Sequence, residues 1–260
     1  MVLREQDRSG VRFMINLAIA LAAGILSWVL TVLVLGSVWT GILPFVGVTI
    51  GLYIWLARKT NKVLEVVVLE AQKQMVQAQT ARTPKQRDDA IDRSIETLKK
   101  GFALKNRQFL VASQLNAQIG QLLYVQKRFE KARPFLEKAY IRSWMAIAML
   151  GCIHFKKKRY DEMKAAFEKA AKYNKKESML YNLYAWCLWK SDQNEAAIAV
   201  LNRGAAVLPS DERLESNLTA LKNNKKMKMR GWKEMWYQFH LEAPPQPKMK
   251  VDKKGLYRGR

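Results

Sequence analysis

Charged residues are missing from one long stretch of this chain. Residues 13–57 contain no Asp, Glu, Lys or Arg, although the whole protein carries a formal net charge of +23. A bilayer core about 30 Å thick is crossed by a helix of about 20 apolar residues. The stretch is long enough for two such helices, over residues 13–35 and 38–57, with a turn at Gly36 and Ser37. The sequence therefore predicts a two-helix transmembrane hairpin over residues 13–57.

The flanks of the predicted hairpin are basic. Arg4, Arg8 and Arg12 precede the first span, and three further cations, Arg58, Lys59 and Lys62, follow the second. An excess of Lys and Arg marks the cytoplasmic side of inner-membrane proteins. We expect a multi-pass protein of a bacterial-type inner membrane with both termini in the cytoplasm, residues 1–12 forming the N-terminal segment. The apolar stretch is too long for a secretory signal peptide.

Cysteine and histidine are rare. The chain has only Cys152, Cys187, His154 and His240. Two thiols within apolar helical patterns provide neither a disulfide framework nor metal-ligand spacing. The sequence has no Gly-rich phosphate loop, HExxH or CxxC motif, and neither histidine lies in a recognisable catalytic pattern. We therefore expect a protein that is not an enzyme, with no catalytic residue, no metal and no cofactor.

Acidic residues are outnumbered by basic ones, with 22 Asp and Glu against 45 Lys and Arg. Such an excess points to anionic partners, which include acidic lipid headgroups, nucleic acid and acidic protein surfaces. The same excess is also the usual topology signal of inner-membrane proteins. Composition alone leaves these alternatives open.

Glycine and proline are absent from residues 59–81, which are rich in helix formers. Pro84 ends this stretch, because the residue before a proline disfavours the α conformation. We expect a helical linker over residues 58–84. It is either a plain spacer or a stalk that self-associates, although no sustained heptad pattern supports self-association.

Internal repeats follow, at a period of about 34 residues. Each unit has a small residue where two helices would cross, followed by four aligned positions on a second helix. The aligned sets are Gly120, Gly151 and Ala185; Phe129, Tyr160 and Asn194; Ala132, Met163 and Ala197; Leu136, Phe167 and Leu201; and Ala139, Ala170 and Gly204, with Pro209 closing the third unit. Two short amphipathic helices cannot bury their apolar faces alone, so such units are stable only when stacked.

This pattern resembles the tetratricopeptide repeat, most clearly in "GCIHFKKKRYDEMKAAFEKAAKYN". Met163, Asn194 and Gly204 depart from the family pattern. A degenerate upstream unit is visible because "SIETLKKGFALKN", residues 94–106, parallels residues 197–209. The resemblance covers residues 85–226, including a capping helix over residues 211–226. It implies an all-α fold in which the hairpin and linker precede a solenoid of three to four helix pairs.

The resemblance also implies a binding groove. In the family, the first helix of each unit lines a concave surface that binds extended peptides or partner helices. Carried over position by position, the groove would present Gln121, Tyr124, Phe155, Lys156, Asn182, Trp186, Trp189 and Lys190. An aromatic, mildly basic groove suits a segment with apolar anchors and some acidity. Aromatic residues at helical spacing are equally typical of a core, and that alternative stays open for each of them.

The C-terminal part, residues 227–260, is a basic, Trp-containing tail that we expect to be partly disordered. Trp232, Met235, Trp236 and Phe239 lie at the spacing of one apolar helix face, surrounded by Lys and Arg. Such a stripe is typical of a helix at a membrane interface. Alternatively, it docks on the repeat array or on the linker helix.

Together these patterns indicate a membrane-anchored scaffold or adaptor that binds other proteins of a membrane-associated complex. The lipid bilayer, with its anionic inner leaflet, is the second expected partner. The alternative is a membrane tether for nucleic acid or ribosomes that works through the basic tail, whose phosphate contacts would weaken steeply with salt.

Overall fold

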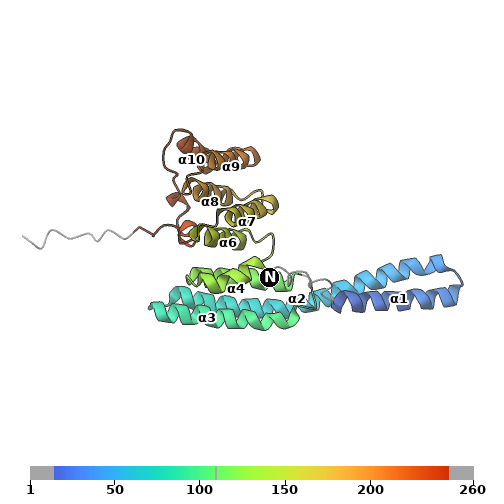
Figure 1. Ribbon diagram of the computed structural model, residues 1–260. Helices are drawn as coiled ribbons and strands as arrows, with labels where there is room; N and C mark the ends of the chain where they lie inside the picture. Colours follow the sequence, from blue (N-terminus) through green and yellow to red (C-terminus); the bar gives the residue numbers. More distant parts are fainter. Residues whose placement is uncertain (1–14, 109, 246–260) are drawn as a thin grey trace, which may run out of the picture.

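The computed structural model describes residues 15–108 and 110–245. The predicted N-terminal flank and the end of the basic tail lie outside these described residues. Every regular element within them is helical, so the predicted all-α fold is confirmed: two long apolar helices in contact are followed by paired helices in a tetratricopeptide-like array. In Figure 1 the two apolar helices project to one side, and the helix pairs stack across that direction.

The hairpin consists of α1 (Ile15–Leu35), a short 3-10 turn η1 (Val38–Gly41) and the first half of α2 (Ile42–Thr80). Gly36 provides the turn because its φ of 65° is easily reached only without a Cβ. The two helices approach closely where a Cβ on Gly24 would meet the Thr49 side chain. Both helices are long enough and apolar enough to cross a membrane.

Helix α2 does not end at the basic residues that follow the apolar run. It continues to Thr80 as one helix, and its second half packs against α3 (Pro84–Lys100). Ala71 and Ala78 are buried there, and the Ser94 hydroxyl donates to the Ala71 carbonyl oxygen at 3.0 Å. The segment predicted as a linker therefore lies within the first helix pair of the array.

The rest of the array is a stack of helix pairs closed by one further helix (Figure 1). A 3-10 turn, η2 (Gly101–Leu104), leads into it. The pairs are α4 (Val111–Val125) with α5 (Phe129–Glu137), α6 (Trp144–Lys156) with α7 (Tyr160–Tyr173), and α8 (Ser178–Trp189) with α9 (Asn194–Val207), followed by α10 (Glu212–Lys222). The Asp211 side chain caps α10 by accepting bonds from the backbone N–H groups of Arg213 and Leu214.

Each of these three pairs turns through the same backbone geometry. Lys127, Lys158 and Asp192 have φ values of 61°, 58° and 58° and occupy equivalent positions after the first helix of each pair. The residue after each of them donates its N–H to a carbonyl oxygen five residues earlier, as in Arg128 to Leu123. This is the Schellman ending of a helix, which sends the chain back antiparallel.

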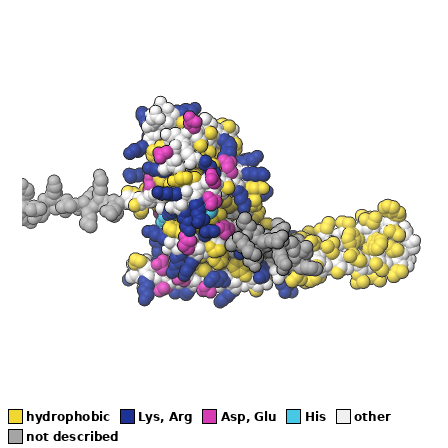
Figure 2. Space-filling view, viewed as in Figure 1, with side chains coloured by type: hydrophobic (Ala, Val, Ile, Leu, Met, Phe, Trp, Pro, Cys, Tyr) yellow, Lys and Arg dark blue, Asp and Glu magenta, His cyan; other side chains and the backbone are white. Residues whose placement is uncertain are grey.

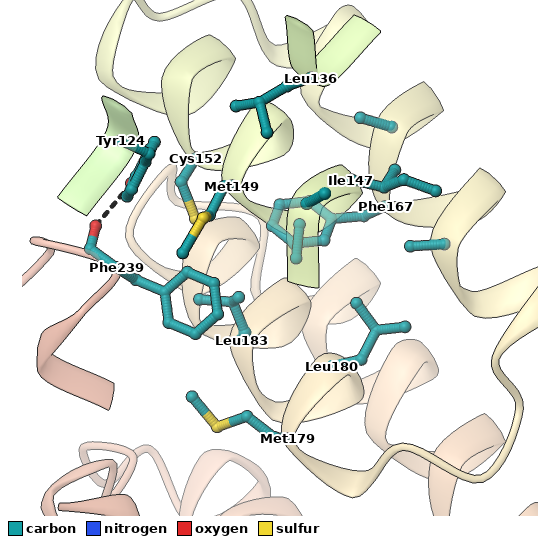
Figure 3. Packing of buried hydrophobic residues seen from close by; sticks show 14 of the residues in the cluster. Tyr124, Leu136, Ile147, Met149, Cys152, Phe167, Met179, Leu180, Leu183 and Phe239 are labelled. Carbon is teal, nitrogen blue, oxygen red and sulfur yellow. Dashed lines mark hydrogen bonds between the residues drawn. The ribbon is translucent and has the colours of Figure 1, made fainter. Parts of the chain in front are cut away.

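The small repeat positions lie where the helices of a pair cross. A Cβ on Gly120 would come within 2.6 Å of the Leu136 side chain, and one on Gly151 within 2.8 Å of Phe167. Ala185 is fully buried at the matching place in α8. The resulting core is one continuous cluster that runs from α2 through the array. Figure 3 shows the part of it between α4 and α8, with Phe239 of the C-terminal segment.

After α10 the chain turns back along the array. Residues 223–229 lead to a 3-10 turn, η3 (Arg230–Trp232), and a four-residue helix, α11 (Glu234–Tyr237). Met227, Met229, Trp236 and Phe239 belong to the same buried cluster as the array helices. We call residues 230–242 the strap.

Candidate functional site

The predicted groove residues come from α4, α6 and α8, the first helices of the three repeated pairs. Tyr124, Asn182 and Trp186 are buried; Gln121, Phe155 and Trp189 are half-buried; Lys156 and Lys190 are exposed. Two of their rings are in contact, since Phe155 meets Trp186 edge-on with ring centroids 5.8 Å apart.

The two groove lysines lie over aromatic rings. Lys156 Nζ is 4.1 Å from the ring centroid of Phe129, and Lys190 Nζ is 4.4 Å from that of Trp189. Cation–π contacts at such distances favour this placement of the ammonium groups. Gln121 faces the start of α6 instead, where its Nε2 donates to the Ser143 hydroxyl at 3.2 Å.

The groove is filled by the strap. Trp236 packs edge-on against Trp186 with ring centroids 5.1 Å apart, and both Trp236 and Phe239 are 0% exposed. The Tyr124 hydroxyl donates to the carbonyl oxygen of Phe239 at 2.6 Å, the bond drawn in Figure 3. The strap therefore crosses from α10 past α8 to α4, against the order of the helices in the chain.

The aromatic residues predicted to form one helix face in the tail do not lie on one helix. Lys233 has a φ of 50°, so no single helix carries Trp232 and Phe239 together. Trp236 and Phe239 dock on the array, which was the alternative to a membrane-interface helix. Trp232 is half-buried with the Arg213 guanidinium 4.3 Å from its ring centroid, whereas Met235 is 39% exposed.

His240 lies at the α4 end of the strap. Its Nε2 is 3.0 Å from the Val125 carbonyl oxygen, and its ring stacks on Tyr124 at 5.8 Å. Burial lowers the pKa of His240, the hydrogen bond to Val125 opposes this, and the charges of Lys156, Lys127 and Arg87 lower it further. The imidazole is therefore neutral near neutral pH and donates from Nε2 to the carbonyl oxygen.

A polar network ties the segment before the strap to the groove. Asn217 Nδ2 donates to the Asn182 side-chain oxygen at 2.7 Å, and the Lys228 backbone N–H donates to the Asn217 side-chain oxygen at 2.7 Å. All these bonds lie among buried or half-buried groups, where losing one partner is costly. One network thus connects α8, the capping helix α10 and the segment before the strap.

Sequence reasoning missed the roles of Asn217 and His240. Asn217 carried a usable signal, because it is an asparagine three residues after Leu214 on the apolar face of the capping helix. His240 carried none, since its contacts are with residues of α4 more than a hundred positions earlier.

The strap leaves the array beside a basic cleft. This cleft of about 590 Å³ is lined by Arg82, Arg87, Lys127, His240 and the acidic Asp88, among others. In the described ranges, no three His, Cys, Asp or Glu side chains converge as a metal site would require.

Comparison with protein families identifies one repeat. A tetratricopeptide repeat matches residues 146–177, which span α6 and α7. Searches among curated proteins and solved structures found no match to the chain. The chain therefore contains a tetratricopeptide repeat at α6 and α7, within an array whose neighbouring pairs turn in the same way.

Proposed function

We propose that this protein is a membrane-anchored adaptor whose helical array binds other proteins of a membrane-associated complex. The observation that carries the proposal is the continuity of α2, which runs from the apolar hairpin into the first pair of the array. An array built on the same helix as its anchor is held at a set height above the bilayer. The proposal assigns the chain no catalytic role of its own.

The hairpin supports the membrane part of the proposal. Its outward side chains are large and apolar, as with Leu33 at 76% exposure and Leu43 at 83%. Figure 2 shows this apolar surface covering the projecting arm, in contrast to the mixed surface of the array. An exposed apolar surface of that kind is typical of a segment that contacts lipid. Arg58, Lys59 and Lys62 would then lie on the cytoplasmic side of a bacterial-type inner membrane, with both termini there.

The array supports the protein-binding part. A tetratricopeptide repeat is a protein-interaction module, and the surface formed by α4, α6 and α8 binds a peptide segment here, namely the chain's own strap. Partners would be recruited to the same surface or to its rim, where Trp189 and Lys190 remain accessible.

Site-specific photo-crosslinking in native membranes tests this function. A photoreactive residue at Lys190, on the groove rim, is expected to capture a discrete partner band. The same residue at Val207, 40% exposed on α9, is the matched control and is expected not to capture that band. The absence of any Lys190-specific product, with the protein correctly inserted, would rule out the adaptor function.

A nucleic-acid or ribosome tether that works through the basic C-terminal part is a second candidate. Four lysines at the end of the capping helix and just after it are all exposed, namely Lys222, Lys225, Lys226 and Lys228. Phosphate binding through these lysines would weaken with added salt, with a slope that falls by about one for each lysine removed. RNA binding that is unaffected by replacing these lysines with Gln would exclude this candidate.

A further inference from the structure

The strap shows which side chains the groove accepts. It inserts an indole and a phenyl group three residues apart, Trp236 and Phe239. The indole meets Trp186, and the phenyl ring lies 6.4 Å from the ring of Trp144 between centroids. Tyr124 fixes the strap backbone at the second of these residues, because its hydroxyl donates to the Phe239 carbonyl oxygen. The groove therefore fits a segment with Trp and Phe at this spacing.

Past Phe239, at the α4 end of the groove, the surrounding charged side chains are mostly cationic, and the strap places His240 among them. His240 lies there on Tyr124, and Lys156 lies over the adjacent Phe129 ring. Arg87 and Lys127 line the cleft that adjoins it, with Asp88 as the acidic residue of the same cleft. Among the described residues, none of the ion pairs involves Lys156, Lys127 or Arg87.

We propose that the strap is an exchangeable occupant of this groove, and that the external ligand is a protein segment with Trp and Phe three residues apart followed directly by a carboxylate. The aromatic pair takes the places of Trp236 and Phe239. The carboxylate takes the place of His240, where three cations attract it. This inference rests on the proposed function, because it names the class of partner that the adaptor recruits.

A free ligand displaces the strap only if it binds the groove more tightly than the strap does. A tethered segment competes with a free ligand at an effective concentration of about millimolar. A ligand that only reproduces the strap's contacts loses that competition. At the position of His240 the carboxylate supplies an attraction that the strap lacks there, because the strap's own Glu242 bonds to Trp236 Nε1. The groove therefore opens to ligands that are acidic at this position and stays closed to other apolar segments. The strap in this way converts a generally apolar groove into a selective one.

Peptide binding to the full chain in neutral-lipid nanodiscs tests the proposal. The probes are a fluorescent peptide of residues 230–245 and the same peptide with His240→Glu. The receptors are the wild-type protein and the Trp236→Ala/Phe239→Ala variant, in which the strap is released. We expect the released variant to bind the His240→Glu peptide about tenfold or more tightly than the wild type does, because the tethered competitor is gone.

Controls separate charge from shape. The His240→Glu peptide is expected to bind the released variant about fivefold or more tightly than the unchanged peptide, a preference that salt and a further Lys127→Gln/Lys156→Gln change reduce. Met235→Ala alters an exposed residue of the same strap and is expected to bind as the wild type does. A folded released variant that binds neither peptide, or both peptides equally, would overturn the proposal.

Hydrogen exchange provides a second measurement that does not depend on the released variant folding. Saturating His240→Glu peptide is expected to raise amide exchange in residues 230–242 of the wild-type protein and to leave α7 and α9 unchanged. Unchanged exchange in the strap at saturation would mean that the strap does not leave. If the peptide displaces the strap but photo-crosslinking from Lys190 captures no partner, the groove chemistry stands and the adaptor role fails.

Discussion

The hairpin and the array each contain strongly apolar helices, but the apolar side chains of α1 in the hairpin are mostly exposed and those of α8 in the array are mostly buried. In α1 only Asn16, Ala20 and Gly24 are buried, whereas in α8 ten of twelve residues are buried. The array helices are short and pair off against one another, so protein surrounds them. The hairpin helices pack mainly against each other, and most of their apolar surface stays exposed. Apolarity alone therefore does not distinguish a buried core helix from an exposed apolar helix; the number of packing partners does.

Helix α2 belongs to both regions, and its chemistry changes along its length. At the border, Asn16 Nδ2 donates to the Thr60 hydroxyl at 2.9 Å, and Leu64 lies close to Gly101 of the array. A buried polar bond at this level fixes how α1 sits on α2 where the array begins. The border is thus a change of surroundings around one helix, with no break in its backbone.

The largest expected difference between the two regions comes from removing one large apolar side chain in each. Phe167→Ala empties a fully buried site between α6 and α7 and is expected to lower the free energy of unfolding of the array by about 3–5 kcal/mol. Leu33→Ala removes an apolar side chain of the hairpin that is 76% exposed and is expected to leave that free energy unchanged. Urea unfolding followed by circular dichroism measures both. Equal losses would contradict the contrast between the regions.

A smaller effect comes from adding one methyl group. Gly151→Ala places a Cβ 2.8 Å from Phe167, and the resulting overpacking is expected to destabilise the array by about 1–3 kcal/mol. Gly47→Ala in the hairpin meets no atom within 4 Å and is the matched control, expected to change stability little. Thermal unfolding compares the two variants. A neutral Gly151→Ala would show that α6 and α7 cross with room to spare.

The smallest effect is a pH dependence of the strap. His240 has a lowered pKa when docked, so its contribution is fully present above the free value of about 6.5 and is lost as pH falls below it. The groups around it are Lys156 on α6, Lys127 in the α4–α5 turn, Arg87 on α3, Tyr124 on α4 and Asp88 in the cleft.

Protection of residues 233–242 from hydrogen exchange, normalised to the free peptide at each pH, reports this dependence. It is expected to fall by up to about tenfold for each pH unit below about 6.5, until the docked pKa is reached. His240→Phe keeps a stacking ring without a titrating group and is expected to flatten the profile. The same fall in that variant would assign the effect to another group.

Much of the array follows from local sequence, whereas the occupied groove does not. Gly120 and Gly151 mark helix crossings because only a small residue fits there, and their spacing is enough to reveal the repeat. The absence of glycine and proline after Lys59 predicts a helix, and Arg58 marks the end of the uncharged run without ending the helix. The contact of Trp236 with Trp186 joins positions fifty residues apart without a repeating pattern, so only the three-dimensional structure assigns it.

Cysteine accessibility in sealed membrane vesicles tests the central contrast most directly. Leu26 lies in the middle of α1 at 63% exposure, and Val207 lies on α9 at 40%, while the native Cys152 and Cys187 are fully buried. If lipid surrounds the hairpin and water surrounds the array, Val207→Cys reacts with a water-soluble maleimide and Leu26→Cys stays unlabelled until detergent denatures the protein. Labelling of Leu26→Cys as fast as Val207→Cys in intact vesicles would contradict the account.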